Sequence, residues 1–381
     1  MKIKIAFVTN MCTHYTRPLF EELARCYDIK FYFTGGYEDY WHKENGLKSG
    51  DFKGKYLPGF FLIPKFRITL PLLCLPVRSF DVIVKTIDDR FALPLIFVMA
   101  KIFRKPFVLW TGLWAHPQTL IHQVTYGMTK FLYAHADAII TYGEHVRRYL
   151  IDLGIDEHKI FCARHTTDNT VYNRPVSEGQ QKELKERLGI SQGDKIILYV
   201  GRLEEGKGLN YLIDAVSGLT PSPVVLFVGT GSKEKFLRRL CTIKGVRSYF
   251  VGHVPNEQLY LYYSIADIFV LPSVTTRDFK EPWGLAINEA MNQSCPVVTT
   301  NAVGAAAGGL VEDGKTGFIV TEKNSSQLAD VIKRLLTNDD LRIKMGTTGH
   351  LKIKDWTPQQ ASLDFSQAIN FVHSKNRDTR Q

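Results

Sequence analysis

The segment that decides the fold is residues 281–291, which read Glu281-Pro282-Trp283-Gly284-Leu285-Ala286-Ile287-Asn288-Glu289-Ala290-Met291. An apolar run precedes it at residues 266–272 (ADIFVLP), and another follows at residues 296–300 (PVVTT). Similar apolar runs alternate with helical patterns along the whole chain. This alternation predicts an α/β protein with parallel sheets.

The same segment carries two carboxylates around an expected helix start. Pro282 fits the first helical position, where a missing N–H costs nothing, so Glu281 lies at the helix N-terminus and Glu289 about two turns inside. At ~1.5 Å rise per residue the carboxylates are roughly 12 Å apart along the axis. Gly284 leaves room for close backbone approach, and free N–H groups favour an anion. Two hydroxyl-binding carboxylates flanking a diphosphate suit a nucleotide sugar, with the sugar on one and the ribose on the other.

The segment also resembles the E-x7-E signature of retaining glycosyltransferases of family 4, which share the GT-B fold. The resemblance implies a catalytic role for Glu281 and donor-binding roles for Glu289, Gly284 and Leu285. The alternative is an ordinary surface helix with two glutamates. The flanking strands favour the functional interpretation.

A second motif follows the strand expected at residues 195–200. Residues 201–208 read GRLEEGKG, which is nearly a phosphate-binding P-loop, but Gly208 replaces the hydroxyl residue that would hold magnesium. The motif instead resembles the G-R-L-x3-K-G segment of family 4, in which Arg202 and Lys207 would hold the donor diphosphate. Two cations can stabilise the leaving diphosphate without a metal, so we expect no metal or other cofactor.

Two further turns of the C-terminal half follow strand ends. The turn at residues 227–232 lacks the third glycine of a dinucleotide fingerprint, so NAD binding has little support. The resemblance places Gly229 beside the donor, although a plain tight turn explains it equally well. It also places the backbone of His253 and Val254 near the nucleobase, with the His253 side chain as a simple loop residue.

The N-terminal half departs further from the family. His116 resembles a histidine that many relatives place near the transferred sugar, although an incidental loop histidine is an equal alternative. Asp88, Asp89 and Arg90 follow a strand and suit either an acceptor contact or a helix cap. Residues 9–15 lack the glycine-rich turn of the family. Whether this loop contacts a phosphate, with or without help from Arg17, is therefore left open.

Length and composition bound the remaining properties. The 381 residues are 45% hydrophobic, which suggests about two soluble domains. No apolar run reaches the ~18 residues that span a bilayer, and the N-terminus fits a first strand better than a secretory signal. The six cysteines form no C-x-x-C pair, so a reducing cytoplasmic setting is expected. The net charge of +10 favours anionic partners, and the usual nucleic-acid motifs are missing.

The sequence therefore predicts a GT-B protein of two Rossmann-like domains with parallel sheets facing across a cleft. Residues 1–173, completed by a helix at 359–381, would bind the acceptor, and residues 174–358 would bind the nucleotide sugar, separated by a linker at 173–179. Residues 165–168 form an expected hinge. The polar loop at residues 35–64 is long enough to expect a binding role.

The predicted activity is the retaining transfer of a sugar from a nucleotide-sugar donor to a glycan hydroxyl in polysaccharide or glycoconjugate synthesis. A sugar-nucleotide epimerase, a phosphorylase or a non-catalytic sugar-nucleotide-binding protein remains as an alternative. The acceptor is expected to be a glycan, with a lipid-linked one as an option. Residues 58–78 mix apolar and basic side chains, which fits either an anionic membrane surface or an ordinary core with solvated charges. Further cations that suit such a surface are Lys101, Arg104, Lys105, Lys130, Arg147 and Arg148.

Overall fold

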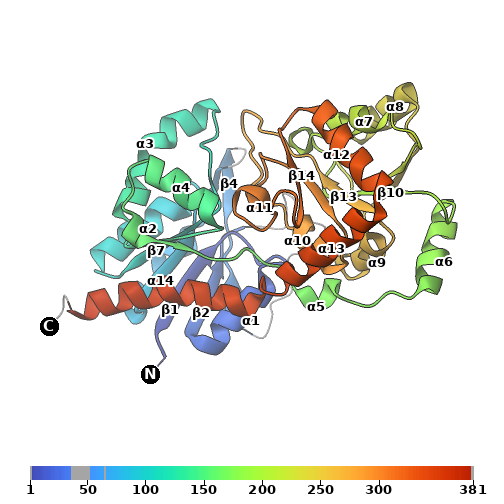
Figure 1. Ribbon diagram of the computed structural model, residues 1–381. Coiled ribbons are helices and arrows are strands. Elements are labelled where there is room, and N and C mark those ends of the chain that lie inside the picture. Colours follow the sequence, from blue (N-terminus) through green and yellow to red (C-terminus); the bar gives the residue numbers. More distant parts are fainter. Residues whose placement is uncertain (1, 36–51, 64–65, 379–381) are drawn as a thin grey trace. The chain divides into compact units, whose positions relative to one another are not determined.

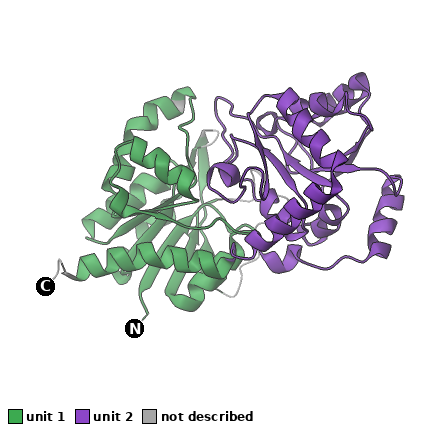
Figure 2. Cartoon of the chain, viewed as in Figure 1, with its two compact units in different colours: residues 1–167, 358–381 green, residues 168–357 purple. Residues whose placement is uncertain are grey.

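The computed structural model describes residues 2–35, 52–63 and 66–378. The chain divides into two compact units (Figure 2): unit 1 holds residues 1–167 and 358–381, and unit 2 holds residues 168–357. The division falls at residue 167 rather than 173. Residues just after it are bound within unit 2, because the Asn169 side-chain amide donates to the carbonyls of Ile353 and Trp356, each at 3.1 Å. The predicted linker at 173–179 therefore lies inside unit 2.

Unit 1 is built on a parallel sheet. Its central strands are buried on both faces, as their nearly continuous apolar sequences predict. Among the described residues the sheet has seven strands in the order β3-β2-β1-β6-β7-β8-β9. The strands are β1 (Lys4–Thr9), β2 (Asp28–Phe33), β3 (Gly54–Tyr56), β6 (Val82–Thr86), β7 (Phe107–Thr111), β8 (Ala138–Thr141) and β9 (Ile160–Cys162). Of the predicted binding loop at 35–64, residues 36–51 and 64 lie outside the described residues, and the remainder contains β3 and β4.

Helices cover both faces of this sheet (Figure 1). One face packs against η1 (Leu70–Cys74), α2 (Ala92–Ile102), α3 (Leu120–His135) and α4 (Glu144–Asp152). The other face packs against α1 (Arg17–Cys26) and α14 (Pro358–Asp378). Arg164 fixes α14 to the sheet edge through two 2.8 Å contacts with the Asp364 carboxylate. The remaining elements are a β4–β5 hairpin (Phe60–Ile63, Phe66–Ile68), η2 (Val77–Ser79) and η3 (Glu157–Lys159).

Unit 2 carries a second parallel sheet. Among the described residues it has six strands in the order β12-β11-β10-β13-β14-β15. The strands are β10 (Ile196–Val200), β11 (Val224–Val228), β12 (Ser248–Gly252), β13 (Ile268–Leu271), β14 (Val297–Thr300) and β15 (Gly317–Val320). The apolar runs at residues 195–200, 266–272 and 296–300 predicted β10, β13 and β14 to within about two residues.

The helices of unit 2 form two groups. One contains α7 (Leu209–Val216), α8 (Glu234–Lys244) and α12 (Ser325–Thr337), in which α7 packs against both others. The second contains α9 (Leu259–Ser264), α10 (Ala286–Asn292) and α13 (Asp339–Ile353), in which α10 is central. Shorter or peripheral elements are α5 (Asn169–Tyr172), α6 (Glu178–Leu188), η4 (Glu205–Lys207), η5 (Asn256–Gln258) and α11 (Gly304–Ala307). The expected hinge at 165–168 leads directly into α5.

The strand orders locate a ligand-binding position in each unit. In unit 1 the chain moves outward in one direction from β1 and in the other from β6, which are neighbours. In unit 2 the corresponding neighbours are β10 and β13. Ligands of open α/β sheets bind beyond the carboxyl ends of the strands at this reversal. The loops after these four strands are therefore the places to look for function.

Candidate functional site

The loop after β10 lies tightly against the end of β13. Gly208 closes η4 with a φ of +63°, and a Cβ at this position would be 2.1 Å from the carbonyl oxygen of Pro272. Only glycine permits both the left-handed backbone and this close approach. Backbone N–H of Val274 donates to the carbonyl of Gly206 at 2.9 Å and joins the two loops. As a result, the preceding residue, Lys207, is held beside the segment that follows β13.

Lys207, Ser273 and Glu281 meet at this position. Lys207 Nζ forms an ion pair with Glu281 Oε2, and Ser273 Oγ donates to the same oxygen at 3.0 Å. The Lys207 and Glu281 side chains are only 13% and 9% exposed, so their attraction is little screened by water. Lys207 Nζ also lies 5.2 Å from the centre of the Phe279 ring. We call Lys207, Ser273 and Glu281 together the Lys207–Ser273–Glu281 cluster.

The cluster joins two residues that the sequence motifs singled out separately. Lys207 was expected on a diphosphate and Glu281 in a catalytic role, but their direct ion pair was not expected. Ser273 was missed altogether. It lies two residues after β13, at the carboxyl end of a strand beside the chain reversal, and this position is the signal that could have identified it.

The expected helix start at Pro282 is wrong. Residues 281–285 are not helical, and α10 begins at Ala286, so Glu289 lies in its first turn. Gly284 adopts a φ of +91°, and the carbonyls of Glu281 and Trp283 accept hydrogen bonds from Gly304 and Ala305 at 3.1 and 2.8 Å. These bonds to a distant segment replace the helical ones. The two carboxylates therefore do not share one helix, and the 12 Å axial separation does not apply.

Glu289 is buried beneath the site. Its carboxylate accepts a 2.7 Å hydrogen bond from the Tyr263 hydroxyl. Burial raises the pKa of Glu289 to about 7, although this hydrogen bond acts in the opposite direction. At neutral pH this carboxyl group therefore changes charge readily. Its predicted contact with a donor stays a prediction, as does the role of Leu285, which immediately precedes α10.

The other predicted donor-binding loops lie at the carboxyl ends of neighbouring strands. Gly229 follows β11 and packs so closely on the loop after β10 that a Cβ would be 2.0 Å from the Gly201 carbonyl oxygen. The Glu204 carboxylate joins the two loops by accepting from Ser232 N and Oγ at 2.9 and 2.6 Å. These bonds lower the pKa of Glu204 and keep it ionised.

Arg202, His253 and Val254 occupy the same edge of the unit 2 sheet. Arg202 is exposed in the loop after β10, and its carbonyl accepts a 2.7 Å bond from the buried Tyr199 hydroxyl. His253 is exposed and Val254 buried just after β12. The sheet thus places the loops that carry Arg202, Gly229, His253 and Val254 at the carboxyl ends of its strands.

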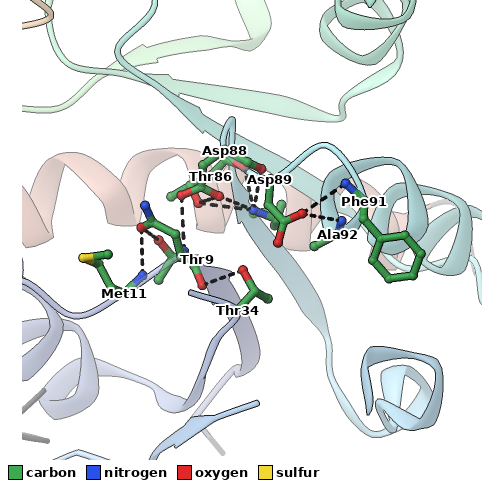
Figure 3. A network of polar contacts seen from close by, with 10 residues as sticks. Thr9, Met11, Thr34, Thr86, Asp88, Asp89, Phe91 and Ala92 are labelled. Atoms are coloured by element: carbon green, nitrogen blue, oxygen red, sulfur yellow. Dashed lines mark hydrogen bonds and ion pairs between the residues drawn. The ribbon is translucent and has the colours of Figure 1, made fainter. Parts of the chain in front are cut away.

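In unit 1, the reversal between β1 and β6 holds a polar network around a buried lysine (Figure 3). Lys85, whose side chain is completely buried, pairs with the Asp88 carboxylate and donates to the Asp88 carbonyl at 2.9 Å. Asp88 also accepts from the backbone N–H of Asn10 at 3.2 Å, which connects the loops after β6 and β1. Lys85 was not predicted, although a lysine inside the apolar strand VIVKT is a signal for a buried ion pair.

Asp89 acts as a helix cap, one of its two expected roles. Its Oδ1 accepts from the backbone N–H groups of Phe91 and Ala92, each at 3.0 Å, at the start of α2 (Figure 3). Its own φ is +66°. Arg17, considered as a phosphate contact, bonds Glu21 at 2.9 Å one turn along α1.

His116 follows β7 and contacts α3. Its Nε2 lies 2.7 Å from the carbonyl oxygen of His122, which can only accept, so Nε2 carries the proton. Its ring centre is 4.7 Å from that of Tyr126. The other nitrogen, Nδ1, has no hydrogen-bond partner among the described residues. In this tautomer Nδ1 can accept a hydrogen bond from a hydroxyl, and the proposed catalytic role of His116 stays a prediction.

Within residues 2–35, 52–63 and 66–378, no group of three or more His, Cys, Asp or Glu side chains is arranged to hold a metal ion. In the same part of the chain, no helix has the length and apolar character needed to cross a bilayer.

Comparison with known proteins connects this geometry to a family. Residues 180–352 match the family described as glycosyl transferases group 1. The alpha-D-kanosaminyltransferase of Streptomyces kanamyceticus is 29% identical over 60% of this chain and 60% of its own length. The D-inositol 3-phosphate glycosyltransferase of Corynebacterium urealyticum is 30% identical over 56% of this chain and 50% of its own length. The matches thus span about half to three-fifths of these curated relatives.

A solved structure matches both units. The Anabaena protein Alr3699/HepE, in complex with UDP, has a TM-score of 0.76 and 18% identity, covering 97% of this chain and all of that one. This likeness supports the fold alone, and it agrees with the two parallel sheets predicted from the sequence. The chain has the GT-B fold, and its residues 180–352 match the family described as glycosyl transferases group 1.

Proposed function

We propose that the protein is a retaining glycosyltransferase of family 4 type, which moves a sugar from a nucleotide-sugar donor to a hydroxyl group of a glycan. The observation that carries the proposal is the Lys207–Ser273–Glu281 cluster at the chain reversal of unit 2. It places a cation and a carboxylate in contact within a segment that matches a glycosyltransferase family. The relatives named above carry glycosyltransferase names, which supports the same reaction class.

In this proposal Lys207 acts on the donor diphosphate. Transfer breaks the bond between the anomeric carbon and the oxygen of the terminal phosphate, and negative charge grows on the leaving diphosphate. Lys207, with Arg202 in the same loop, stabilises that charge electrostatically. A metal ion is then not required for departure of the diphosphate. Donor binding would draw Lys207 partly away from Glu281 and free that carboxylate for sugar hydroxyls.

The acceptor completes the reaction. Its hydroxyl oxygen forms the new bond to the anomeric carbon on the face that the diphosphate leaves, so configuration is retained. The departing phosphate oxygen takes the hydroxyl proton, which balances the step without a protein nucleophile. His116 can orient a hydroxyl through the lone pair of Nδ1. We assign donor binding to unit 2 and acceptor binding to unit 1, whose sequence departs more from the family.

The cellular setting is part of the proposal. All six cysteines are free thiols, which suits a reducing cytoplasm. We propose a role in polysaccharide or glycoconjugate synthesis, with a lipid-linked glycan acceptor presented at the inner face of the cell membrane. Peripheral attachment to an anionic membrane surface would bring the protein to this acceptor.

Thermal unfolding in the presence of UDP-, GDP-, ADP- and dTDP-sugars tests donor binding. UDP-glucose is the first choice, because the Anabaena protein has also been solved in complex with it. A ligand that binds the folded state stabilises it by about 2.7 kcal/mol when present at a hundredfold excess over its Kd. We expect one nucleotide class to raise the unfolding temperature, and less so in Lys207→Met. If no member of the panel stabilises the wild-type protein, the proposed donor class is wrong.

A further inference from the structure

The positive charge of the chain is concentrated in two stretches of unit 1. Residues 52–80 and 90–136 together contain ten Lys or Arg residues and not one Asp or Glu. The formal net charge of the whole protein is +10, so acidic and basic residues cancel in the remainder. These two stretches supply η1, α2 and α3, which cover one face of the unit 1 sheet. An excess of positive charge equal to the net charge of the protein therefore lies in these two stretches of unit 1.

Helix α3 exposes apolar side chains in a regular stripe. Leu120, Val124, Met128 and Phe131 are spaced by four, four and three residues, which places them on one side of a helix. All four are exposed, and Val124 is 86% exposed. A surface helix normally turns such a stripe toward the core. Here the core side is supplied by Leu132 and Tyr133, which are buried, so the exposed stripe is additional to the packing of the helix.

Neighbouring elements extend this apolar stripe. The rings of Phe97 on α2 and Phe131 on α3 lie 5.9 Å apart, and Figure 1 shows the two helices on the same side of unit 1. Helix α2 exposes Val98 and Ile102, of which Ile102 is 68% exposed. Element η1 packs against α2 and exposes Leu70 and Leu73. We call these exposed faces the η1–α2–α3 surface.

Cations surround the apolar groups of this surface. Lys130 is exposed on α3 beside Phe131. The Arg78 guanidinium lies 5.0 Å from the centre of the Phe103 ring, directly after α2. Lys101 on α2 pairs with Asp137 at 2.9 Å, so its charge is partly neutralised. The sequences of η1, α2 and α3 contain no acidic residue that would repel an anionic partner.

We infer that the η1–α2–α3 surface binds the headgroup region of an anionic lipid bilayer. Apolar groups at the centre of a cationic, acid-free surface match the two layers of that partner, with acyl chains inside and anionic headgroups around. A nucleic acid would be met by cations and polar groups rather than by exposed leucine, valine and phenylalanine. The inference deepens the proposed function. It rests on that function for the purpose of membrane binding, which is to bring the protein to a lipid-linked acceptor.

The structure also reduces the set of cations that the sequence suggested for membrane binding. Arg147 on α4 contacts Glu144 at 3.2 Å and Glu157 at 3.1 Å, so it belongs to an ion-pair cluster with two acids. We therefore exclude Arg147 from the membrane-binding residues, and Arg148 with it, because both lie on α4 outside the η1–α2–α3 surface. Lys101, Arg104, Lys105 and Lys130, all within the acid-free stretches, are retained.

Vesicle flotation of the full-length protein tests the inference. The vesicles consist of phosphatidylcholine alone or with phosphatidylglycerol, at low and high salt. We expect flotation with the anionic vesicles at low salt and weaker flotation at high salt, because each cation contributes roughly fivefold to binding. Val124→Glu should weaken binding at least about tenfold, since it removes an apolar contact and adds a repelled charge.

A matched control tests whether membrane binding depends on this surface or on any exposed apolar side chain. Ile343 on α13 of unit 2 is 61% exposed, so Ile343→Glu makes the same chemical change elsewhere. This variant should float like the wild-type protein. Thermal unfolding verifies that both variants fold, and Lys130→Glu provides a second change in the surface. Equal flotation of Val124→Glu and wild type, or equal loss in Ile343→Glu, would overturn the inference.

Two further outcomes are decisive. If the protein ignores anionic vesicles but forms a dimer that Val124→Glu dissociates, a second copy covers this surface and the lipid inference is wrong.

Nucleotide-sugar binding is measured on the same variants without vesicles and should not change. A wild-type protein that floats but binds no nucleotide sugar would contradict the proposed function while supporting lipid binding.

Discussion

Glu281 Oε2 accepts hydrogen bonds from both the Lys207 ammonium and the Ser273 hydroxyl, although Lys207 lies 74 positions earlier in the chain. The ion pair is largely removed from water, and it lies beyond the carboxyl ends of the two strands at which the unit 2 sheet reverses direction. Burying two charges carries a desolvation cost that can exceed their mutual attraction, so the pair is weak evidence for a purely stabilising role. The proposed partner is a nucleotide sugar, whose diphosphate and hydroxyl groups match the cation and the carboxylate.

The ion pair should show strong energetic coupling. Lys207→Met leaves the Glu281 carboxylate buried without its cation, and we expect it to reduce the free energy of unfolding by about 3 kcal/mol. Adding Glu281→Gln should restore part of this loss, because no unpaired charge remains. Urea unfolding of the two single variants and the double variant measures the coupling. Strictly additive effects would contradict a direct interaction.

Glu289 should make stability depend on pH. Its folded-state pKa of about 7 lies above the ordinary value of 4.5, so the native state holds its proton more tightly than the unfolded state. This group's contribution is fully present below about pH 4.5 and is lost as pH rises to about 7. Glu289→Gln keeps a hydrogen-bond acceptor for Tyr263 without the charge. We expect the variant to match the wild type near pH 4.5 and to exceed it by roughly 3 kcal/mol above pH 7.

The measurement is urea unfolding of both proteins across this pH range. Taking the difference between them cancels the titration of every other group. A constant difference at all pH values would show that Glu289 titrates normally.

Gly208 should be irreplaceable for a steric reason, and a second glycine, Gly245, serves as the experimental control. Gly208 and Gly245 share a φ of +63°, but only at Gly208 would a Cβ meet backbone, whereas nothing lies within 4 Å at Gly245. Gly245→Ala should cost about 1–2 kcal/mol, the strain of a left-handed alanine. Gly208→Ala should cost more and should also weaken nucleotide-sugar binding by displacing Lys207. Equal losses of unfolding free energy in the two variants would contradict the close packing on Pro272.

Catalysis should not require a metal ion. Lys207 and Arg202 are proposed to stabilise the leaving diphosphate, so the rate of sugar release should be unchanged when EDTA is added. The assay compares the chelated protein with the same protein supplied with magnesium or manganese. Strict dependence on either ion would show that the two cations are not sufficient.

The sheets were predictable from the sequence because parallel strands are buried on both faces. Runs such as Ile196–Val200 and Ile268–Leu271 are apolar throughout, which identifies them without tertiary information. The motifs after these strands identified Lys207 and Glu281 for the same reason, since a strand end fixes the position of the following loop.

The contact between those residues and the start of α10 could not be predicted in this way. The ion pair depends on which strands become neighbours, and sequence spacing does not encode that order. The helix start was misplaced because the carbonyls of Glu281 and Trp283 bond residues 304 and 305, a long-range effect that overrides the local preference of Pro282. Lys85 escaped notice because its partner, Asp88, was interpreted as an acceptor contact or a helix cap.

Release of nucleoside diphosphate tests the central claim, that the Lys207–Glu281 pair acts on a nucleotide sugar. Wild type, Glu281→Gln and Glu205→Gln are incubated with the donor panel, with and without added glycans. Glu205 is a suitable control because it lies in the same loop but is exposed and pairs with Lys233 at 3.3 Å. We predict release from at least one donor, a loss of about 10- to 150-fold in Glu281→Gln and none in Glu205→Gln. Wild-type rates in Glu281→Gln, or no release from any donor that binds, would contradict the account.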